Sequence, residues 1–308
     1  GIFYRQLATV FAVDGVSFSI EPGKTLGLVG ESGCGKSTIG RALVGLYQAT
    51  EGQIMFQGQN IAGLKGAALK NLRCDMQMIF QDPYESLNPR HTIGDILAEP
   101  FIIHRQGNPA QRNQQVLSLL DRVGLPADAV HKYPHEFSGG QRQRIGIARA
   151  IALHPKLIIC DEPVSALDVS IQSQILNLLL ELQEEMGMAY LFIAHDLAVV
   201  KHVSDRVAVM YLGRIVEIAD SEDIYLQPLH PYTQALLSAI PMPDPKQRRR
   251  FKPLPGEVPS PINPPPHCHF VERCPYATDR CRTETPLLRN IDGQAGSHQV
   301  ACHFAGDL

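Results

Sequence analysis

The sequence predicts an α/β fold in which a mainly parallel sheet is covered by helices on both faces. Short apolar runs alternate with helical stretches along most of the chain, which is the pattern of such a sheet. A glycine-rich loop joins one of the first runs to a helix. With 308 residues, 44% of them hydrophobic, the chain can bury a substantial core. One large domain with an appended segment is therefore expected.

The first elements predict a strand, loop and helix unit. In residues 16–20, Val16, Phe18 and Ile20 alternate with serines, which is typical of a half-buried strand. Residues 25–29 predict a buried strand that leads into the glycine loop. From Lys36 onward, apolar residues recur at helical spacing.

The later elements continue the alternation. Strands are predicted at residues 54–56, 76–80, 157–160, 189–194 and 206–211. Residues 92–141 are rich in helix formers and predict a helical insertion. A helix over residues 169–186 should end at Gly187, which suits the left-handed position after a helix.

The composition changes at Pro241. Ten of the 26 residues from 241 to 266 are proline, which favours an extended linker. We therefore predict a domain over residues 1–229, with a helical subdomain at about 90–153, and an extension over residues 230–308 that carries a proline-rich linker and a cysteine cluster.

The bulk properties exclude some functions. The net charge of −3 provides no positive field for nucleic acid, and no run approaches the roughly 18 apolar residues of a spanning helix. No export signal is recognised, and because the chain starts at Gly1 we expect residues to precede it. Isolated thiols among seven cysteines indicate a reducing compartment, so a cytoplasmic location is predicted.

One motif has the spacing of a phosphate-binding P-loop. Its glycines let backbone N–H groups converge on phosphate, Lys36 suits the β- and γ-phosphates, and the Ser37 hydroxyl suits a magnesium shell. The alternative is a glycine-rich turn before a helix. The motif consists of Gly30, Glu31, Ser32, Gly33, Cys34, Gly35, Lys36, Ser37 and Thr38.

Two carboxylates follow the apolar run at 157–160. Ligands bind at the carboxyl ends of parallel strands, so Asp161 suits the magnesium shell and Glu162 suits a general base that activates water. Without the P-loop, they would be two ordinary solvated acids.

Ser138, Gly139, Gly140 and Gln141 open another helix. Ser138 and Gln141 have the spacing of a capping box, which is the simpler interpretation. Two glycines in a first turn each cost roughly 1 kcal/mol of helix propensity, however, and that cost favours a second phosphate-facing helix start.

Together these motifs resemble those of the ATP-binding subunits of ABC transporters, although Phe137 stands where leucine is usual. The resemblance implies a P-loop NTPase with a RecA-like core, an antiparallel β edge and a helical subdomain. It also implies that two cassettes pair head to tail, so that Ser138, Gly140 and Gln141 of one complete the ATP site of the other.

The resemblance assigns roles to further residues. Gln81 matches the glutamine that contacts magnesium and water, His195 the histidine at the γ-phosphate, and Asp168 the aspartate at the dimer interface. Magnesium would be held by Ser37, Gln81 and Asp161, and the catalytic residues would be Glu162, His195 and Gln81. The aromatic that stacks on adenine would be Phe3, Tyr4 or Phe11, or would precede Gly1.

Residues 81–90, 230–237 and 255–261 resemble, more narrowly, the ATP-binding subunits of bacterial dipeptide and oligopeptide importers. That resemblance implies a peripheral location at the cytoplasmic face of the inner membrane. It implies a second ATPase subunit that is a similar but distinct chain, two permeases and an extracytoplasmic peptide-binding protein. The alternatives are a non-transport ABC ATPase, a metal or redox sensor centred on the extension, or an importer of glutathione, murein peptide or nickel.

Four cysteines crowd the end of the chain, at Cys268, Cys274, Cys281 and Cys302. Four thiolates suit an iron–sulfur cluster or a tetrahedral zinc ion. The importer resemblance implies a [4Fe-4S] cluster, whereas His267, His269 and His303 keep zinc as the rival, and free thiols are the third possibility.

Overall fold

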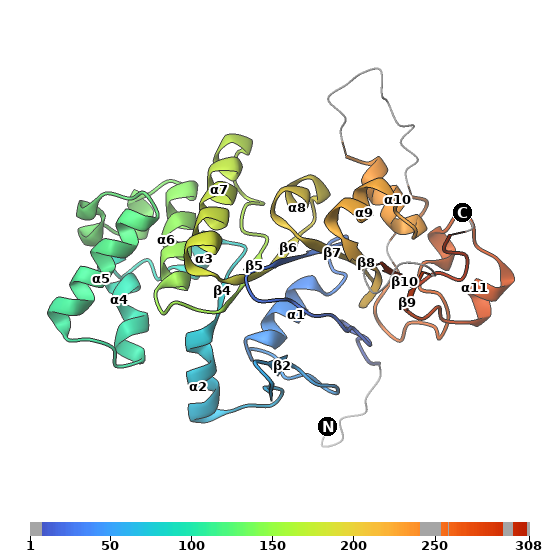
Figure 1. The fold of residues 1–308 in the computed structure, drawn as a ribbon, viewed down its shortest axis with the longest axis horizontal. Helices are drawn as coiled ribbons and strands as arrows, with labels where there is room; N and C mark the ends of the chain where they lie inside the picture. Colours follow the sequence, from blue (N-terminus) through green and yellow to red (C-terminus); the bar gives the residue numbers. More distant parts are fainter. Residues whose placement is uncertain (1–7, 241–253, 258, 292–297, 307–308) are drawn as a thin grey trace, which may run out of the picture. The chain divides into compact units, whose positions relative to one another are not determined.

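The computed structural model describes residues 8–240, 254–257, 259–291 and 298–306, and the chain divides into two compact units (Figure 1). The first unit comprises residues 1–19, 26–39 and 194–308, and the second comprises residues 20–25 and 40–193. The P-loop and the C-terminal segment therefore belong to the same unit.

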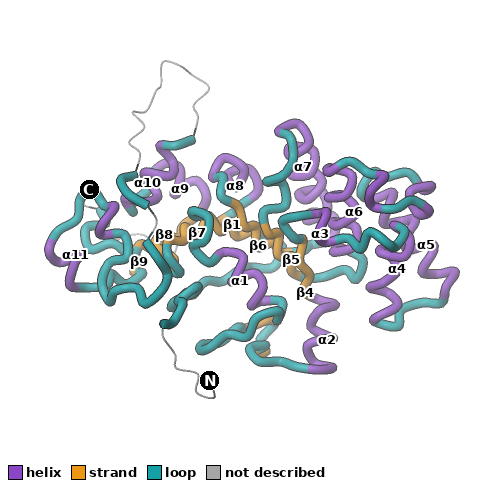
Figure 2. The backbone as a smooth tube through the Cα atoms, turned by 180° about the vertical axis from the view of Figure 1, so that it is seen from behind, coloured by secondary structure: helices purple, strands orange, loops and turns teal. Residues whose placement is uncertain are grey.

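The first unit is built on strands that run parallel and then antiparallel. β1 pairs with β7 in parallel, whereas β7–β8, β8–β10 and β10–β9 are antiparallel. α8 covers one face of β1 and β7, and α1 covers the other (Figures 1 and 2). The elements are β1 (Thr25–Val29), α1 (Lys36–Leu43), α8 (Leu197–Val203), β7 (Arg206–Tyr211), β8 (Arg214–Asp220), α9 (Ser221–Leu226), α10 (Pro231–Ser238), α11 (Asp279–Thr283), β9 (Arg289–Asn290) and β10 (Gln299–Val300).

The second unit holds three parallel strands in the order β4, β5, β6, a separate β2–β3 hairpin, and a helical group formed by α4, α5 and α6 (Figure 2). Its elements are β2 (Met55–Phe56), β3 (Gln59–Asn60), α2 (Gly66–Asp75), β4 (Met76–Ile79), α3 (Pro83–Ser86), α4 (Ile93–Ile103), α5 (Pro109–Arg122), α6 (Gly139–Ile151), β5 (Leu157–Asp161), α7 (Val169–Met186) and β6 (Ala189–Ala194).

Most predicted elements are confirmed. α7 spans the predicted residues and ends at Gly187, whose φ of 65° is left-handed. The parallel pairs, the antiparallel edge and the helical insertion are present.

The strand predicted at residues 16–20 is wrong. The side chains alternate between half-buried and exposed, but no described strand pairs with this segment. Alternating burial therefore arises here without a hydrogen-bonded ladder.

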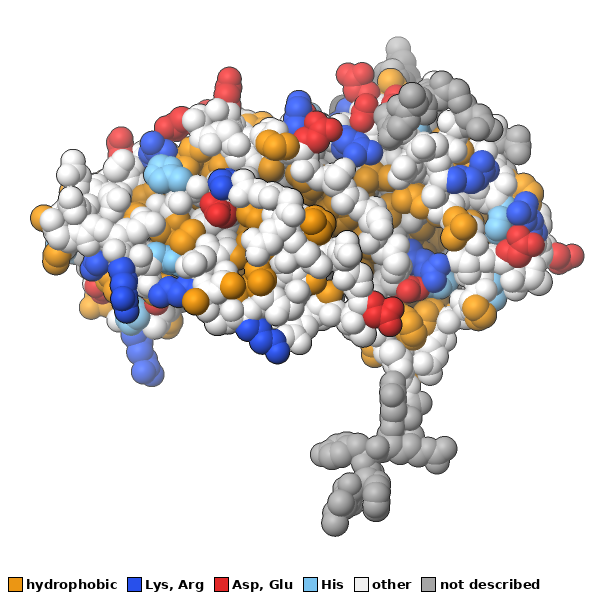
Figure 3. Space-filling view, turned by 60° about the horizontal axis from the view of Figure 1, so that its bottom comes forward, with side chains coloured by type: hydrophobic (Ala, Val, Ile, Leu, Met, Phe, Trp, Pro, Cys, Tyr) orange, Lys and Arg blue, Asp and Glu red, His pale blue; other side chains and the backbone are white. Residues whose placement is uncertain are grey.

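Within the described residues, no helix has the length and apolarity needed to cross a bilayer. Acidic and basic side chains are interspersed on the face shown in Figure 3.

Candidate functional site

The P-loop connects the end of β1 to the start of α1. Gly33 and Gly35 have φ angles of 81° and 109°, and a Cβ on Gly35 would lie 2.0 Å from the carbonyl oxygen of Ala12. Only glycine fits at residue 35, because a side chain would collide with backbone. The loop thus turns tightly onto a helix N-terminus, the geometry that receives phosphate.

Lys36 lies inside the curl of this loop. Its ammonium group donates to the carbonyl oxygens of Gly30 and Glu31, at 2.7 and 3.0 Å, and the residue is only 4% exposed. The positive charge is therefore held at the centre of the loop. Cys34 is buried near Lys36, and burial raises the pKa of its thiol. The thiol is therefore neutral and packs as a small apolar side chain.

Two predicted catalytic residues meet in the second unit. Gln81 follows β4, Glu162 follows β5, and the Gln81 Nε2 donates to the Glu162 Oε2 at 3.2 Å. Glu162 has a φ of 48°, which is rare for a residue with a side chain, and such strain often accompanies function. The parallel pairing of β4 with β5 brings these residues together although 81 positions separate them.

Asp161 and His195 also lie at the carboxyl ends of strands. Asp161 is the last residue of β5 and is only 1% exposed. His195 directly follows β6, is exposed, and belongs to the first unit. Each therefore stands at the carboxyl end of a parallel strand, where ligands bind.

The start of α6 contains the predicted capping box. Ser138 Oγ accepts from the Gln141 N–H at 3.3 Å, and the Gln141 side chain accepts from the Ser138 N–H at 3.0 Å. A Cβ on Gly140 would lie 2.6 Å from Ile171 Cγ2 of α7, so packing already requires this glycine. The cost argument for a phosphate site therefore does not apply to Gly140. Ser138, Gln141 and Asp168 are exposed.

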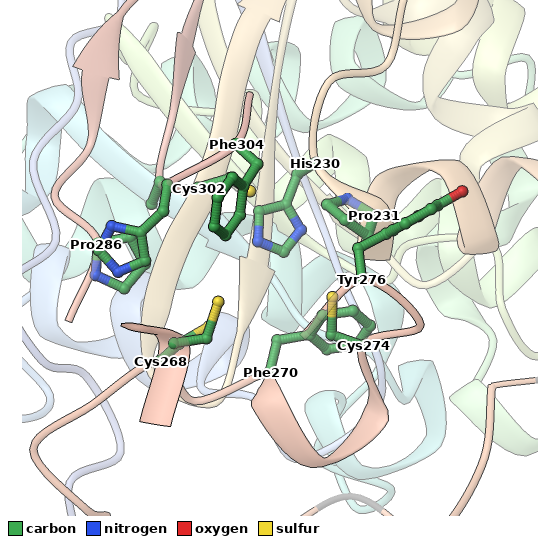
Figure 4. Close-up of a pocket in the computed structure, with 12 residues that line it drawn as sticks. His230, Pro231, Cys268, Phe270, Cys274, Tyr276, Pro286, Cys302 and Phe304 are labelled. Atoms are coloured by element: carbon green, nitrogen blue, oxygen red, sulfur yellow. The ribbon is translucent and has the colours of Figure 1, made fainter. Parts of the chain in front are cut away.

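The four C-terminal cysteines line one pocket. Figure 4 shows Cys268, Cys274 and Cys302 around a space bordered by His230, Phe270 and Phe304. Cys281 lines it too, and His303 is the only one of the three predicted histidines that does. Burial raises the pKa of Cys268 to about 11, and the neighbouring cysteines add to the shift.

No group of three or more His, Cys, Asp or Glu side chains among the described residues converges closely enough to hold a single metal ion. The cysteines thus share a pocket without forming the tight arrangement that a lone ion needs.

A groove of about 900 Å³ lies in the second unit. Gln81, Asp161 and Arg149 line it, together with apolar side chains such as Leu46 and Ile103, which are 50% and 47% exposed. An open groove with exposed apolar walls beside Gln81 suits a protein segment as ligand.

Of the three aromatics predicted to stack on adenine, Phe3 and Tyr4 lie outside the described residues. Phe11 is 39% exposed, and its backbone N–H donates to the carbonyl of Pro261 at 3.0 Å.

Sequence reasoning missed the partners of Glu31 in the P-loop. Arg273 binds the Glu31 carboxylate, and the Tyr232 hydroxyl accepts from its N–H. The available signal was the single carboxylate in the P-loop motif, which would repel phosphate unless a cation pairs with it.

The chain is similar to known proteins over nearly its whole length. Residues 13–165 match the ABC transporter family, and residues 216–281 match the C-terminal region of oligopeptide/dipeptide transporters. The oligopeptide transport ATP-binding protein AppF of Bacillus subtilis is 56% identical over 99% of this chain and 92% of its own length. OppF of Salmonella typhimurium is 53% identical over 97% of this chain and 90% of its own length.

Solved structures agree with this relationship. The ATP-binding cassette MJ0796, in a dimeric post-hydrolysis state with ADP and Pi, is 28% identical with a TM-score of 0.64, covering 71% of this chain and 94% of its own. CbiO1 from Clostridium perfringens also has a TM-score of 0.64 at 28% identity, covering 70% of this chain and 84% of its own. The predicted ABC ATPase cassette fold is confirmed, and the chain belongs to the ATP-binding subunits of oligopeptide ABC transporters.

Proposed function

We propose that this chain hydrolyses ATP to energise the import of dipeptides and oligopeptides. The observation that carries the proposal is the joint presence of a P-loop that excludes a side chain at Gly35 and the hydrogen bond between Gln81 and Glu162. Relatives more than half identical over nearly the whole chain are named oligopeptide transport ATP-binding proteins, which supports peptide as the substrate class.

The proposed roles follow from position and chemistry. Lys36 and the P-loop N–H groups bind the phosphates, and Glu162, oriented by Gln81, takes the proton of the attacking water. His195 contacts the γ-phosphate. Magnesium, when bound, offsets the negative charge on the phosphates, and its ligands would be Ser37, Gln81 and Asp161.

ATP is proposed to lie between two cassettes. Ser138, Gly140 and Gln141 would face the nucleotide of the second cassette, with Asp168 at the same interface. Exposure of Ser138, Gln141 and Asp168 supports this role, because a residue that meets a partner must be accessible.

The proposed assembly contains a second, similar ATPase chain, two permeases and an extracytoplasmic peptide-binding protein, and no nucleic acid. The chain would sit peripherally at the cytoplasmic face of the inner membrane. The groove beside Gln81 would receive a permease segment with an apolar face, since Leu46 and Ile103 are exposed there. Residues 1–229 would form the ATPase domain and residues 230–308 the importer extension.

The cysteine pocket is proposed to hold a [4Fe-4S] cluster, with zinc as the alternative. Convergence of Cys268, Cys274, Cys281 and Cys302 on one pocket supports a metal group. Each cysteine of a cluster binds a different iron, so the thiols need not converge as closely as around one ion. Anaerobic purification with iron, sulfide and visible absorption measurements should find about four irons per chain; colourless, zinc-loaded protein would favour the alternative.

The test of the main proposal is peptide-stimulated ATPase activity. The chain should be co-purified with its permeases, placed in liposomes and supplied with the binding protein and defined peptides. Hydrolysis should rise with peptide and disappear in the Lys36→Ala variant. An ATPase rate that no tested peptide increases would contradict peptide import. An unmodified complex that does not hydrolyse ATP would contradict the ATPase assignment itself.

A further inference from the structure

Glu31 of the P-loop is bound twice by residues far along the chain. Its backbone N–H donates to the hydroxyl of Tyr232 at 2.9 Å, across 201 positions. Its carboxylate accepts two hydrogen bonds from the Arg273 guanidinium, at 2.7 and 2.9 Å, across 242 positions. A two-bond pair of this kind fixes both the position and the orientation of the carboxylate.

The arginine is itself rigidly held. The Arg273 side chain is 6% exposed, its Nε donates to the carbonyl of Pro255 at 3.2 Å, and its guanidinium lies 5.8 Å from the centre of the Tyr211 ring. Tyr211 packs edge-on against Tyr232 and Phe270, at 4.8 and 5.2 Å between ring centres. Because the Arg273 side chain is 6% and the Glu31 side chain 27% exposed, the pair is partly shielded from water, and its charges interact more strongly than those of a fully exposed ion pair.

Glu31 places a negatively charged side chain in the loop that binds the ATP phosphates. A carboxylate next to a triphosphate repels it, and the carbonyl of Glu31 already lies 3.0 Å from the Lys36 ammonium that the phosphates need. Without Arg273, the Glu31 carboxylate would add an uncompensated negative charge to the loop that binds the phosphates. Arg273 neutralises the carboxylate and holds it in one place.

We propose that Arg273 is a positioning residue for the ATP site: by pairing with the Glu31 carboxylate and cancelling its charge, it sets the affinity of the P-loop for ATP. The Tyr232 hydroxyl separately accepts a hydrogen bond from the backbone N–H of Glu31. Both residues belong to the C-terminal part of the chain, so this segment acts on nucleotide binding. The inference rests on the proposed ATPase function.

The test is equilibrium binding of magnesium ATP to the purified full chain, measured by displacement of a fluorescent ATP analogue. In Arg273→Met the Kd should rise about tenfold, because the Glu31 charge is unmasked near the phosphates. In Glu31→Gln the Kd should fall about threefold, because the positive charge of Arg273 is no longer cancelled. The double variant should return to within about twofold of the unmodified chain.

The matched control is Arg282→Met, which removes an exposed ion pair with Glu272 from the same segment and should leave the Kd unchanged. A double variant as weak as Arg273→Met would overturn the charge argument, as would an unaltered Kd in Arg273→Met. Should Arg273→Met fail to fold, Glu31→Gln alone decides, since weaker binding there contradicts the proposal. An unmodified chain that binds no ATP would instead remove the proposed function.

Discussion

Replacing Glu162 with glutamine tests whether this residue is the general base. The amide is nearly the same size, and its oxygen still accepts from the Gln81 Nε2, which lies 3.2 Å from the carboxylate. The variant therefore removes the basic group and keeps the local geometry. ATP binding should be unchanged, whereas kcat should fall.

The size of the fall separates two explanations. Loss of a general base costs about 10² to 10⁴ in rate, or about 3–5 kcal/mol. Weakening one partly exposed hydrogen bond costs only about 1 kcal/mol, which is about fivefold. Gln81→Ala removes this hydrogen bond together with a proposed magnesium ligand, so its loss of activity gives an upper bound on the contribution of the orienting bond.

The assay is single-turnover phosphate release by the assembled transporter, with the ATP Kd measured in parallel. Glu181→Gln on α7 is the control, because Glu181 is an exposed carboxylate away from the strand ends. A loss below tenfold in Glu162→Gln with unchanged ATP binding would refute the base assignment and leave Glu162 with an orienting role.

Three further outcomes are expected. Ile103→Glu should reduce peptide uptake into vesicles at least about tenfold and leave ATP binding unchanged. The control Ile102→Glu changes an exposed residue that does not line the groove and should leave uptake unchanged. Equal losses in the two variants would refute permease docking in the groove. Gly35→Ala should abolish ATP binding and lower Tm, because its Cβ meets the Ala12 carbonyl at 2.0 Å, whereas Gly33→Ala, with nothing within 4 Å, should cost only about 1 kcal/mol of backbone strain. Burial lowers the pKa of His230 from 6.5 to about 4. As the pH falls below 6.5, His230 is therefore protonated in the unfolded chain before it is protonated in the folded chain, and the folded state loses stability. The free energy of unfolding, measured by urea denaturation, should fall by about 3 kcal/mol between pH 6.5 and 4. The His230→Gln variant should show a weaker pH dependence, and a pH profile identical to that of the unmodified chain would refute the role of His230.

Local patterns predicted the parts of the site that depend on neighbours in sequence. The P-loop, the two acids at the end of β5 and the capping box of α6 are each defined within ten residues, and periodicity and capping rules apply over that range. The family resemblance gave Gln81 and Glu162 separate roles in the ATP site, but their hydrogen bond was not predicted, because no local rule states which strands become neighbours. The helix-propensity argument at Gly140 failed because Ile171, whose side chain a Cβ there would meet, lies on another helix; the role of Gly140 at the second cassette stays a proposal.

The residues after 230 were predicted as an extension, yet they complete the first unit. β10 adds a strand to β8, and the buried carboxylate of Glu217 accepts from the N–H groups of Leu229 and His230 and contacts His298 Nε2 at 2.7 Å. Removing residues 254–308 would therefore leave Glu217 short of a buried partner and Glu31 without Arg273. Unpaired buried charges are destabilising, so the shortened chain should lose stability and ATP affinity together.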